Sequence, residues 1–258
     1  MRSGPVRQAS SSPAVELRSV TLVAVTGVAL GPTIEALRAS MARAEFGDVL
    51  LLSHRPPPVE EPGICWRQIE PIRSRDDYSR FMLRGLVEHV RTPYALCVQW
   101  DGFVLDGSGW DPAFLEYEYI GAPWPHFHDD HNVGNGGFSL RSRRLLEASR
   151  ALPLDPPLLE DVIICRRYRP RLEHHGIRFA PEAIARRFSY ERMAPRGDEF
   201  GFHGSFNLVR FLPADQALRL IRRLEPELLA RNERWELLGW ALRHGRFSFA
   251  LEMLRRLA

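Results

Sequence analysis

Short apolar runs alternate with amphipathic stretches over the first hundred residues. Runs rich in β-branched and aliphatic residues predict buried strands, and apolar positions at helical spacing predict helices that cover a sheet. The pattern gives strands at residues 19–28, 48–53, 64–69 and 94–99, with helices at 33–45 and 76–90. This alternation is typical of an α/β fold with a mostly parallel central sheet flanked by helices.

Polar residues follow three of the predicted strands directly. Thr26, Ser53 and Asp101 stand at or just beyond strand ends. In open parallel sheets the carboxyl ends of the strands meet at one edge, and ligands bind there. We therefore expect these three side chains at one edge of the sheet.

The second half of the chain is less regular and becomes helical toward its end. The pattern predicts short strands at 119–124, 134–140 and 184–190, and helices at 141–152, 160–173, 214–224 and 226–258, the last interrupted at Gly245. A Ser- and Arg-rich start without an apolar core predicts a disordered leader. We expect a leader at 1–18, an α/β domain at 19–212 and a C-terminal helical extension at 213–258.

Composition excludes several classes of protein. The 258 residues are 45% hydrophobic and 26% charged, with a net charge of +3. Such a small excess is not that of a nucleic-acid-binding protein. No apolar run is long enough for an integral membrane segment. The three cysteines lack metal-binding spacing, which favours buried free thiols and a cytoplasmic location.

Two segments carry candidate metal ligands. Asp101 follows the fourth predicted strand in the sequence QWDGF, and a carboxylate there could hold a divalent cation. Asp also caps turns, and that alternative is open. His203 lies between glycines in FGFHG, where a neutral imidazole could bind a transition metal or simply face the core.

A glycine-rich segment and a preceding tryptophan are candidates for substrate binding. Asn135, Gly136 and Gly137 lie in VGNGGFSL, where glycines permit unusual backbone angles and close approach to a ligand. A plain hairpin turn is the alternative. Trp124, between two prolines, could stack on a sugar ring or fill the core. Residues 126–132, rich in His and Asp, predict a mobile loop that could cover the site, with a zinc site as the alternative.

Two acids begin the helix predicted at 160–173. Glu160 and Asp161 could offset the helix dipole or cap its first turn. Alternatively, one carboxylate could act as a general base on an acceptor hydroxyl. Position alone favours the helix-capping role.

The order of these motifs resembles the DUF5672 family. The resemblance lies in QWDGFVLD (99–106), FLEYEYIGAPW (114–124), VGNGGFSLRSRRLL (133–146), EDVIICR (160–166) and FGFHG (200–204), and extends over about residues 19–210. Members are regarded as glycosyltransferase-like, with a single-domain GT-A fold. A more distant similarity is to the inverting β-1,4-galactosyltransferases.

These resemblances imply a role for each candidate residue. Asp101 and His203 would hold Mn²⁺, with Mg²⁺ as an alternative. Asp161 would be the catalytic base, with Glu160 beside it. Gly136 and Gly137 would line the donor sugar or the acceptor. One departure is that the acidic motif contains a single Asp, where the galactosyltransferases have two separated by one residue.

Three functions are compared on this basis. The leading hypothesis is a hexosyltransferase that moves a sugar from a nucleotide-sugar, preferably a UDP-sugar, to an acceptor hydroxyl with inversion. The nucleotide base would lie near Thr26 and Asp77. The second is a non-catalytic sugar- or nucleotide-binding module whose helical tail recruits a partner. The third, a metal-dependent phosphoesterase, lacks the bridging carboxylates of a two-metal site.

Overall fold

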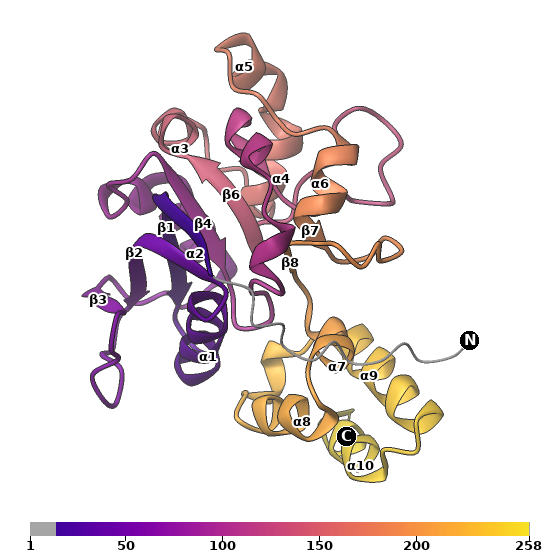
Figure 1. Ribbon diagram of the computed structural model, residues 1–258. Helices are drawn as coiled ribbons and strands as arrows, with labels where there is room; N and C mark the ends of the chain where they lie inside the picture. Colours follow the sequence, from indigo (N-terminus) through magenta and orange to yellow (C-terminus); the bar gives the residue numbers. More distant parts are fainter. Residues whose placement is uncertain (1–13, 258) are drawn as a thin grey trace. The chain divides into compact units, whose positions relative to one another are not determined.

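A six-stranded sheet forms the centre of the larger part of the protein (Figure 1). The computed structural model describes residues 14–257. The strands lie in the order β3-β2-β1-β4-β6-β5. The first four run parallel, whereas β6 is antiparallel to both β4 and β5. Their bounds are β1 Val15–Thr26, β2 Ala44–Ser53, β3 Cys65–Gln68, β4 Tyr94–Val98, β5 Tyr119–Ile120 and β6 Phe138–Ser142. The predicted α/β class with a mostly parallel sheet is confirmed.

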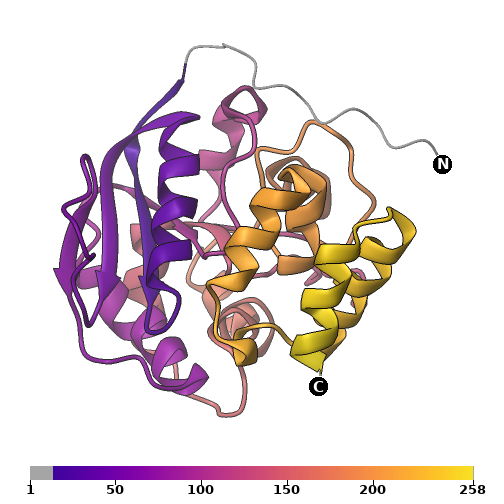
Figure 2. The ribbon, with the colours of Figure 1, turned by 90° about the horizontal axis from the view of Figure 1, so that it is seen from below.

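Alternating side chains of the strands build two cores, one on each face of the sheet. Leu22 of β1 and Leu51 of β2 share one core with Ile34 and Leu37 of α1 (Leu30–Met41). Figure 2 shows this helix lying along one face of the sheet. Val23 and Leu50 lie on the other face with the helical segment that begins at α2 (Arg75–Arg80). That segment continues as a π-helical turn, Phe81–Gly85, and a 3₁₀ turn, Leu86–Glu88. Burial on both faces explains why these strands are continuously apolar in sequence.

The pairing register brings the predicted binding positions to one edge of the sheet. Thr26 pairs with Ser53, and Ala24 pairs with Val98, so both ends lie near the turn that carries Asp101. Because β6 is antiparallel, its first residue, Phe138, pairs with Val98. The glycine-rich segment before β6 therefore reaches the same edge as the carboxyl end of β4.

The elements after β6 complete the larger unit, and the earlier ones among them contribute to a third core. They are α3 Arg143–Ser149, α4 Glu160–Val162, a π-helical turn Ile163–Arg167, α5 Arg169–His174, α6 Glu182–Phe188, β7 Ser189–Tyr190 and β8 Gly201–Phe202. Ser142 caps α3 by accepting a hydrogen bond from the Leu145 backbone N–H. Leu145, Ile163 and Phe179 are buried together in this core.

The predicted strand at 184–190 is wrong over most of its length. Residues Glu182–Phe188 form α6, and the strand is limited to Ser189–Tyr190. Ile184, Ala185 and Phe188 recur at helical spacing and face the core, and burial of that stripe favours a helix.

The chain divides into two compact units after His203. The expected boundary was near Pro213, and β1 begins at Val15 rather than at residue 19. The first 13 residues of the predicted leader lie outside the described residues. Within residues 14–257, no helix combines the length and the apolar character needed to cross a bilayer.

The second unit is helical, as predicted for the end of the chain. It contains a 3₁₀ turn Ser205–Asn207, α7 Leu208–Phe211, α8 Ala214–Arg222, a 3₁₀ turn Pro226–Leu228, α9 Arg231–Arg243 and α10 Phe247–Leu257. Gly245 separates the last two helices with a positive φ of 63°. Trp240 of α9 packs on Phe249 of α10 with ring centroids 5.6 Å apart.

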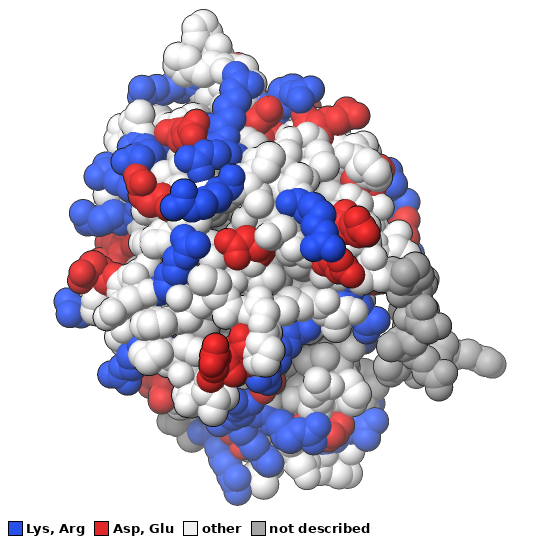
Figure 3. Space-filling model, turned by 60° about the vertical axis from the view of Figure 1, so that its left-hand side comes forward, with Lys and Arg blue, Asp and Glu red and all other residues white. Residues whose placement is uncertain are grey.

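The distribution of surface charge and the exposure of the cysteines can be compared with what the composition predicted. Both acidic and basic side chains lie over the face drawn in Figure 3, with several basic side chains next to one another in its upper left part. All three cysteines are free. Cys97 and Cys165 are buried as expected, but Cys65 is exposed because it lies on the edge strand β3.

Candidate functional site

An aspartate and a histidine far apart in sequence meet at the carboxyl end of β4. Asp101 lies in a tight turn closed by a hydrogen bond from the Gly102 N–H to the Gln99 carbonyl. His203 follows β8, and its backbone N–H donates to the Tyr190 carbonyl. The His203 Nε2 and Asp101 Oδ1 atoms are 3.5 Å apart. The two residues predicted as metal ligands are thus brought together.

His203 lies between two carboxylates. Its Nδ1 atom is 3.4 Å from Glu191 Oε1, and its Nε2 atom is 3.3 Å from Gln99 Oε1 as well as near Asp101. Burial alone would lower the pKa of His203, but the carboxylates of Asp101 and Glu191 raise it well above the usual 6.5. Without a bound cation, the imidazole therefore carries a proton at neutral pH.

The glycine-rich segment is shaped by close contacts. Asn135, not a glycine, has the positive φ of 65°, and its Oδ1 accepts a hydrogen bond from the Gly137 N–H. A Cβ atom on Gly137 would lie 2.0 Å from His203 Nε2, and one on Gly136 would lie 2.2 Å from Glu160 Oε1. These glycines are therefore needed for close packing of site residues on the backbone.

Asp161 is tied to the same segment. Its Oδ2 accepts from the Gly136 N–H at 3.0 Å, and its Oδ1 accepts from the Val162 N–H at 2.8 Å. Burial and the neighbouring Glu160 carboxylate raise its pKa to about 6, despite these hydrogen bonds and the Arg141 charge. A partly accessible carboxylate with such a pKa has the property required of a general base near neutral pH.

Glu160 has a different environment from its neighbour. It is buried, and its Oε1 accepts a hydrogen bond from Arg141 Nη2 at 2.9 Å. Arg141, which is fully buried on β6, also donates to Ser139 Oγ at 3.0 Å and lies over the Tyr119 ring. Its Nη1 atom has no hydrogen-bond partner among the described residues. Glu160 is therefore paired with Arg141 in the interior, whereas Asp161 is partly exposed and bonded to the backbone of the glycine-rich segment.

Two candidates for nucleotide binding have local structural contacts. Thr26 Oγ1 accepts a hydrogen bond from the Ala29 N–H at 3.1 Å, which fixes the turn into α1. Asp77 Oδ2 accepts from the Arg73 N–H, and the Asp77 N–H donates to Ser74 Oγ at the start of α2. These contacts satisfy the first turns of helices. Contact of either residue with a nucleotide remains a prediction.

Trp124 is both a core residue and part of the wall of a cavity. Its ring is buried against Gly134, where a Cβ atom would lie 2.1 Å from Cη2, and it packs edge-on against Phe127. It also lines a cavity of about 380 Å³ formed with the 126–132 loop. Within residues 14–257, no three or more His, Cys, Asp or Glu side chains are grouped to hold a metal, in this loop or elsewhere.

The donor set at Asp101 fits a divalent cation that keeps open positions. The buried Asp101 Oδ1 atom makes no hydrogen bond among the described residues. Mn²⁺ and Mg²⁺ accept few protein ligands when water and phosphate oxygens complete the shell. Asp101 and His203 would provide two ligands, provided that the imidazole loses its proton.

Sequence reasoning missed Gln99, Arg141 and Glu191. Gln99 and Arg141 lie inside the motifs, but a glutamine or an arginine does not by itself indicate a catalytic or metal-binding role. Glu191 is twelve residues from His203, and only the pairing of β7 with β8 brings the two side chains together. No local signal marks Glu191.

Replacing Gly137 with alanine is expected to displace His203. Because the added Cβ would overlap the imidazole, we expect a loss of about 1–3 kcal/mol in the free energy of unfolding. The His203 ring signals in NMR should move, and its pKa should fall toward the usual value as its contact with Asp101 is lost. Gly239→Ala on α9, with its nearest neighbour 4.0 Å away, is the control and should cost nothing. Unchanged His203 signals in Gly137→Ala would contradict the packing described.

The comparisons with known proteins identify the family. The family model described as "Protein of unknown function (DUF5672)" matches residues 67–203, just over half of the chain. The chain belongs to the DUF5672 family. The matched range is narrower than residues 19–210, but it contains Asp101, the glycine-rich segment, Asp161 and His203. The site just described is therefore part of the DUF5672 region. No curated protein matched the chain.

Solved structures similar to this DUF5672 protein are glycosyltransferases by description. A glycosyltransferase involved in glycosylation of the major capsid of PBCV-1 has 13% identity and a TM-score of 0.41, covering 71% of this chain and 91% of that one. The apo glycosyltransferase GlyE of Streptococcus pneumoniae TIGR4 has 12% identity and a TM-score of 0.46, covering 76% and 55%. The mannosyltransferase PcManGT of Pyrobaculum calidifontis, in complex with GDP-Man and Mn²⁺, has 10% identity and a TM-score of 0.45, covering 94% and 81%. TM-scores below 0.5 leave the function to be judged from this chain's own site.

Proposed function

We propose that the protein transfers a hexose from a nucleotide-sugar donor to an acceptor hydroxyl, with inversion at the anomeric carbon. The observation that carries the proposal is the convergence of three features at one edge of the sheet. These are the Asp101–His203 pair, the close-packed glycine segment and the Asp161 carboxylate with its raised pKa. A UDP-sugar is the favoured donor on the motif resemblance.

Asp161 would act as the base. Its carboxylate accepts the proton of the acceptor hydroxyl as the oxygen forms a bond to the anomeric carbon. The bond from that carbon to the diphosphate breaks at the same time, and the nucleoside diphosphate leaves with the bonding electrons. The backbone N–H groups of Gly136 and Val162 hold the carboxylate in place. Fixed geometry of this kind lowers the entropic cost of bringing acceptor and donor together.

The side chains of Asp101 and His203 would hold a divalent cation, Mn²⁺ or Mg²⁺. Such a cation neutralises the negative charge that develops on a departing diphosphate. The contribution of the chain is to place Asp101 and His203 3.5 Å apart, with Gln99 beside them. The free thiols of all three cysteines suit a reducing compartment, and we retain the cytoplasm as the proposed location.

Donor hydrolysis in the presence and absence of metal tests the proposal. We expect the purified protein to bind one of a panel of UDP- and GDP-sugars, including GDP-mannose, and to release the nucleoside diphosphate slowly without an acceptor. Release should require Mn²⁺ or Mg²⁺ and should fall at least tenfold in Asp101→Asn. Asp76→Asn, an exposed acid on α2, is the matched control and should behave as the wild type.

Three outcomes count against parts of this function. Absence of binding and of hydrolysis for every donor would overturn it. Donor binding without turnover, with acceptors present, would favour the non-catalytic binding module. Metal-independent release with an unaffected Asp101→Asn variant would remove the cation from the proposal but retain transfer.

A further inference from the structure

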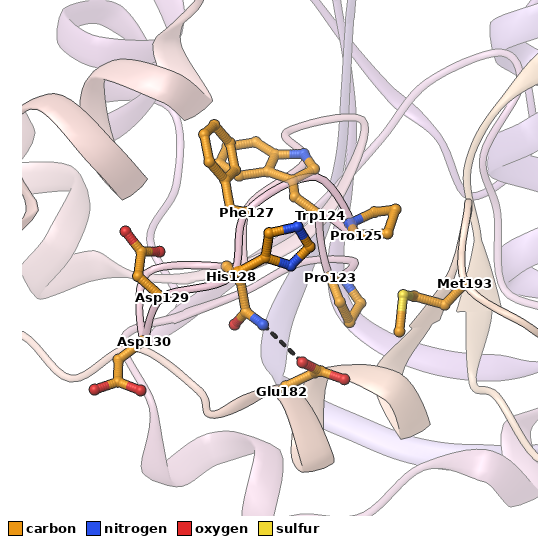
Figure 4. A pocket seen from close by; sticks show the side chains of 10 residues that line it. Pro123, Trp124, Pro125, Phe127, His128, Asp129, Asp130, Glu182 and Met193 are labelled. Atoms are coloured by element: carbon orange, nitrogen blue, oxygen red, sulfur yellow. Dashed lines mark hydrogen bonds between the residues drawn. The ribbon is translucent and has the colours of Figure 1, made fainter.

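A cavity of about 380 Å³ lies outside the Asp101 site and is not accounted for by the donor (Figure 4). Its size is within the range of small-molecule sites, about 300–1,000 Å³. It is formed by the excursion of the chain between Pro123 and Val133, which pair as a β-bridge, together with α6 and the segment after β7. Its lining is Pro123, Trp124, Pro125, Phe127, His128, Asp129, Asp130, Asn132, Glu182 and Met193.

The walls combine ring faces with hydrogen-bonding groups. Figure 4 shows the rings of Trp124 and Phe127 together on one side of the cavity and Glu182 on the opposite side. Glu182 accepts a hydrogen bond from Asn132 Nδ2, so its carboxylate is oriented across the cavity. Aromatic faces beside carboxylate, amide and imidazole groups match a sugar ring, which has apolar C–H faces and hydroxyls at its rim.

The charge of the lining favours an uncharged ligand over an anion. Asp129, Asp130 and Glu182 are all acidic, and no arginine is among the lining residues. Two guanidinium groups lie against these acids from outside the lining. Arg166 Nη1 is 2.5 Å from Asp129 Oδ1, with its guanidinium over the Phe127 ring at 3.9 Å, and Arg186 Nη1 is 3.9 Å from Glu182 Oε1. A phosphate or carboxylate placed in the cavity would face the like charge of Asp130, which has no ion pair of its own among the described residues.

Three segments join this cavity to the Asp161 site. Trp124 packs directly on Gly134, and Gly136 in the same loop donates to Asp161. Arg166, which fixes Asp129, lies in the π-helical turn that follows Asp161. The third connection is the segment after β7, in which Glu191 contacts His203 and Met193 lines the cavity.

We propose that this cavity binds the acceptor as a pyranose ring without negative charge. This inference rests on the proposed function, because it assigns to Asp161 a hydroxyl of the sugar bound in this cavity. The aromatic side chains would cover one face of the ring, while Glu182 and Asp130 would accept hydrogen bonds from its hydroxyls. An uncharged or amino-bearing sugar is thereby selected over a sugar phosphate or a uronic acid.

Saturation-transfer NMR on the full-length protein tests the inference. The probes are methyl pyranosides of glucose, galactose, mannose, glucosamine and N-acetylglucosamine, compared with glucose 6-phosphate and glucuronic acid. At least one uncharged or amino-bearing pyranoside should bind, and the anionic sugars should bind at least tenfold more weakly. Filling the cavity with Met193→Trp should weaken pyranoside binding at least tenfold. Asp130→Asn should reduce the discrimination against anionic sugars.

Matched controls separate the cavity from the rest of the surface. Glu60→Gln and His174→Ala change exposed residues away from the lining and should bind as the wild type does. All variants should keep the wild-type melting temperature within a few degrees. Equal binding of sugar phosphates, or unchanged binding in a folded Met193→Trp, would overturn the inference.

Donor hydrolysis measured in parallel separates the two proposals. Hydrolysis of a nucleotide-sugar without binding of any pyranoside would refute the acceptor site in this cavity but would be consistent with the proposed sugar transfer. Pyranoside binding in a protein that neither binds nor hydrolyses a donor would support the sugar site and overturn the transferase function.

Discussion

Replacing Asp161 with asparagine is expected to lower the rate of sugar transfer by about 10²–10⁴-fold, the usual contribution of a general base. The side chain keeps its size and its place beside Gly136 but loses the ability to take a proton. Donor binding should change little, because the cation ligands Asp101 and His203 are not altered. The measurement is single-turnover transfer with the donor and acceptor identified by the experiments above.

The pH dependence of the transfer rate shows whether Asp161→Asn is slow because a base is lost or because the site is distorted. With the pKa of Asp161 raised to about 6, the wild-type rate should fall by up to tenfold per pH unit below that value and level off above it. The Asp161→Asn variant should lack this slope. A raised pKa also means that folding favours the protonated carboxyl, so the charged carboxylate costs stability at neutral pH.

The stability of the variant should therefore change by less than about 2 kcal/mol at pH 7. Removing the buried charge favours the fold, whereas the asparagine amide loses one of the two backbone hydrogen bonds, a loss of about 1–3 kcal/mol. Undiminished transfer in a folded Asp161→Asn protein would remove Asp161 as the base. Glu160→Gln tests the neighbouring carboxylate. If it lowers the transfer rate more than Asp161→Asn does, in a protein of unchanged stability, Glu160 would be the base.

The strands and the convergence of motifs were accessible from sequence because they follow from local periodicity and from a topological rule. Continuous aliphatic runs predicted β1, β2 and β4, and parallel packing placed their carboxyl ends together. The approach of Asp101 and His203 was expected only through the family resemblance. Nothing in local spacing joins residues about one hundred positions apart.

The helix α6 and the residue Arg141 show where such reasoning fails. A seven-residue run such as Glu182–Phe188 is too short for its period to separate helix from strand, and tertiary burial of Ile184 and Phe188 decides it. The sequence pattern predicts a helix from residue 141, but Arg141 lies in β6 and is fully buried, which arginine almost never is without a partner. The partner that permits its burial, Glu160, lies nineteen residues away in another element.

Arg141→Met is expected to lower the free energy of unfolding by about 3–5 kcal/mol. Breaking a buried pair leaves Glu160 charged and uncompensated in the interior, which is the costly outcome for such pairs. The Gly136 carbonyl and Ser139 hydroxyl would also lose a donor. Chemical denaturation at pH 7 measures the loss, and Arg18→Met, which breaks the exposed Arg18–Glu45 pair on β1 and β2, should cost less than about 1 kcal/mol.

The double variant Arg141→Met/Glu160→Met decides whether the loss arises from the orphaned charge. Removing both charges leaves an apolar pair of similar length, and such replacements of buried ion pairs are often neutral or stabilising. We therefore expect the double variant to be more stable than Arg141→Met alone, with a coupling of about 0.5–3 kcal/mol between the two sites. Additive losses would mean that Arg141 stabilises the fold through packing on Tyr119 rather than through Glu160.

The Arg141–Glu160 ion pair also sets the position of the proposed base, because Glu160 directly precedes Asp161 and the pair holds Gly136. A double variant that folds but transfers sugar slowly would separate this positioning effect from the effect on stability.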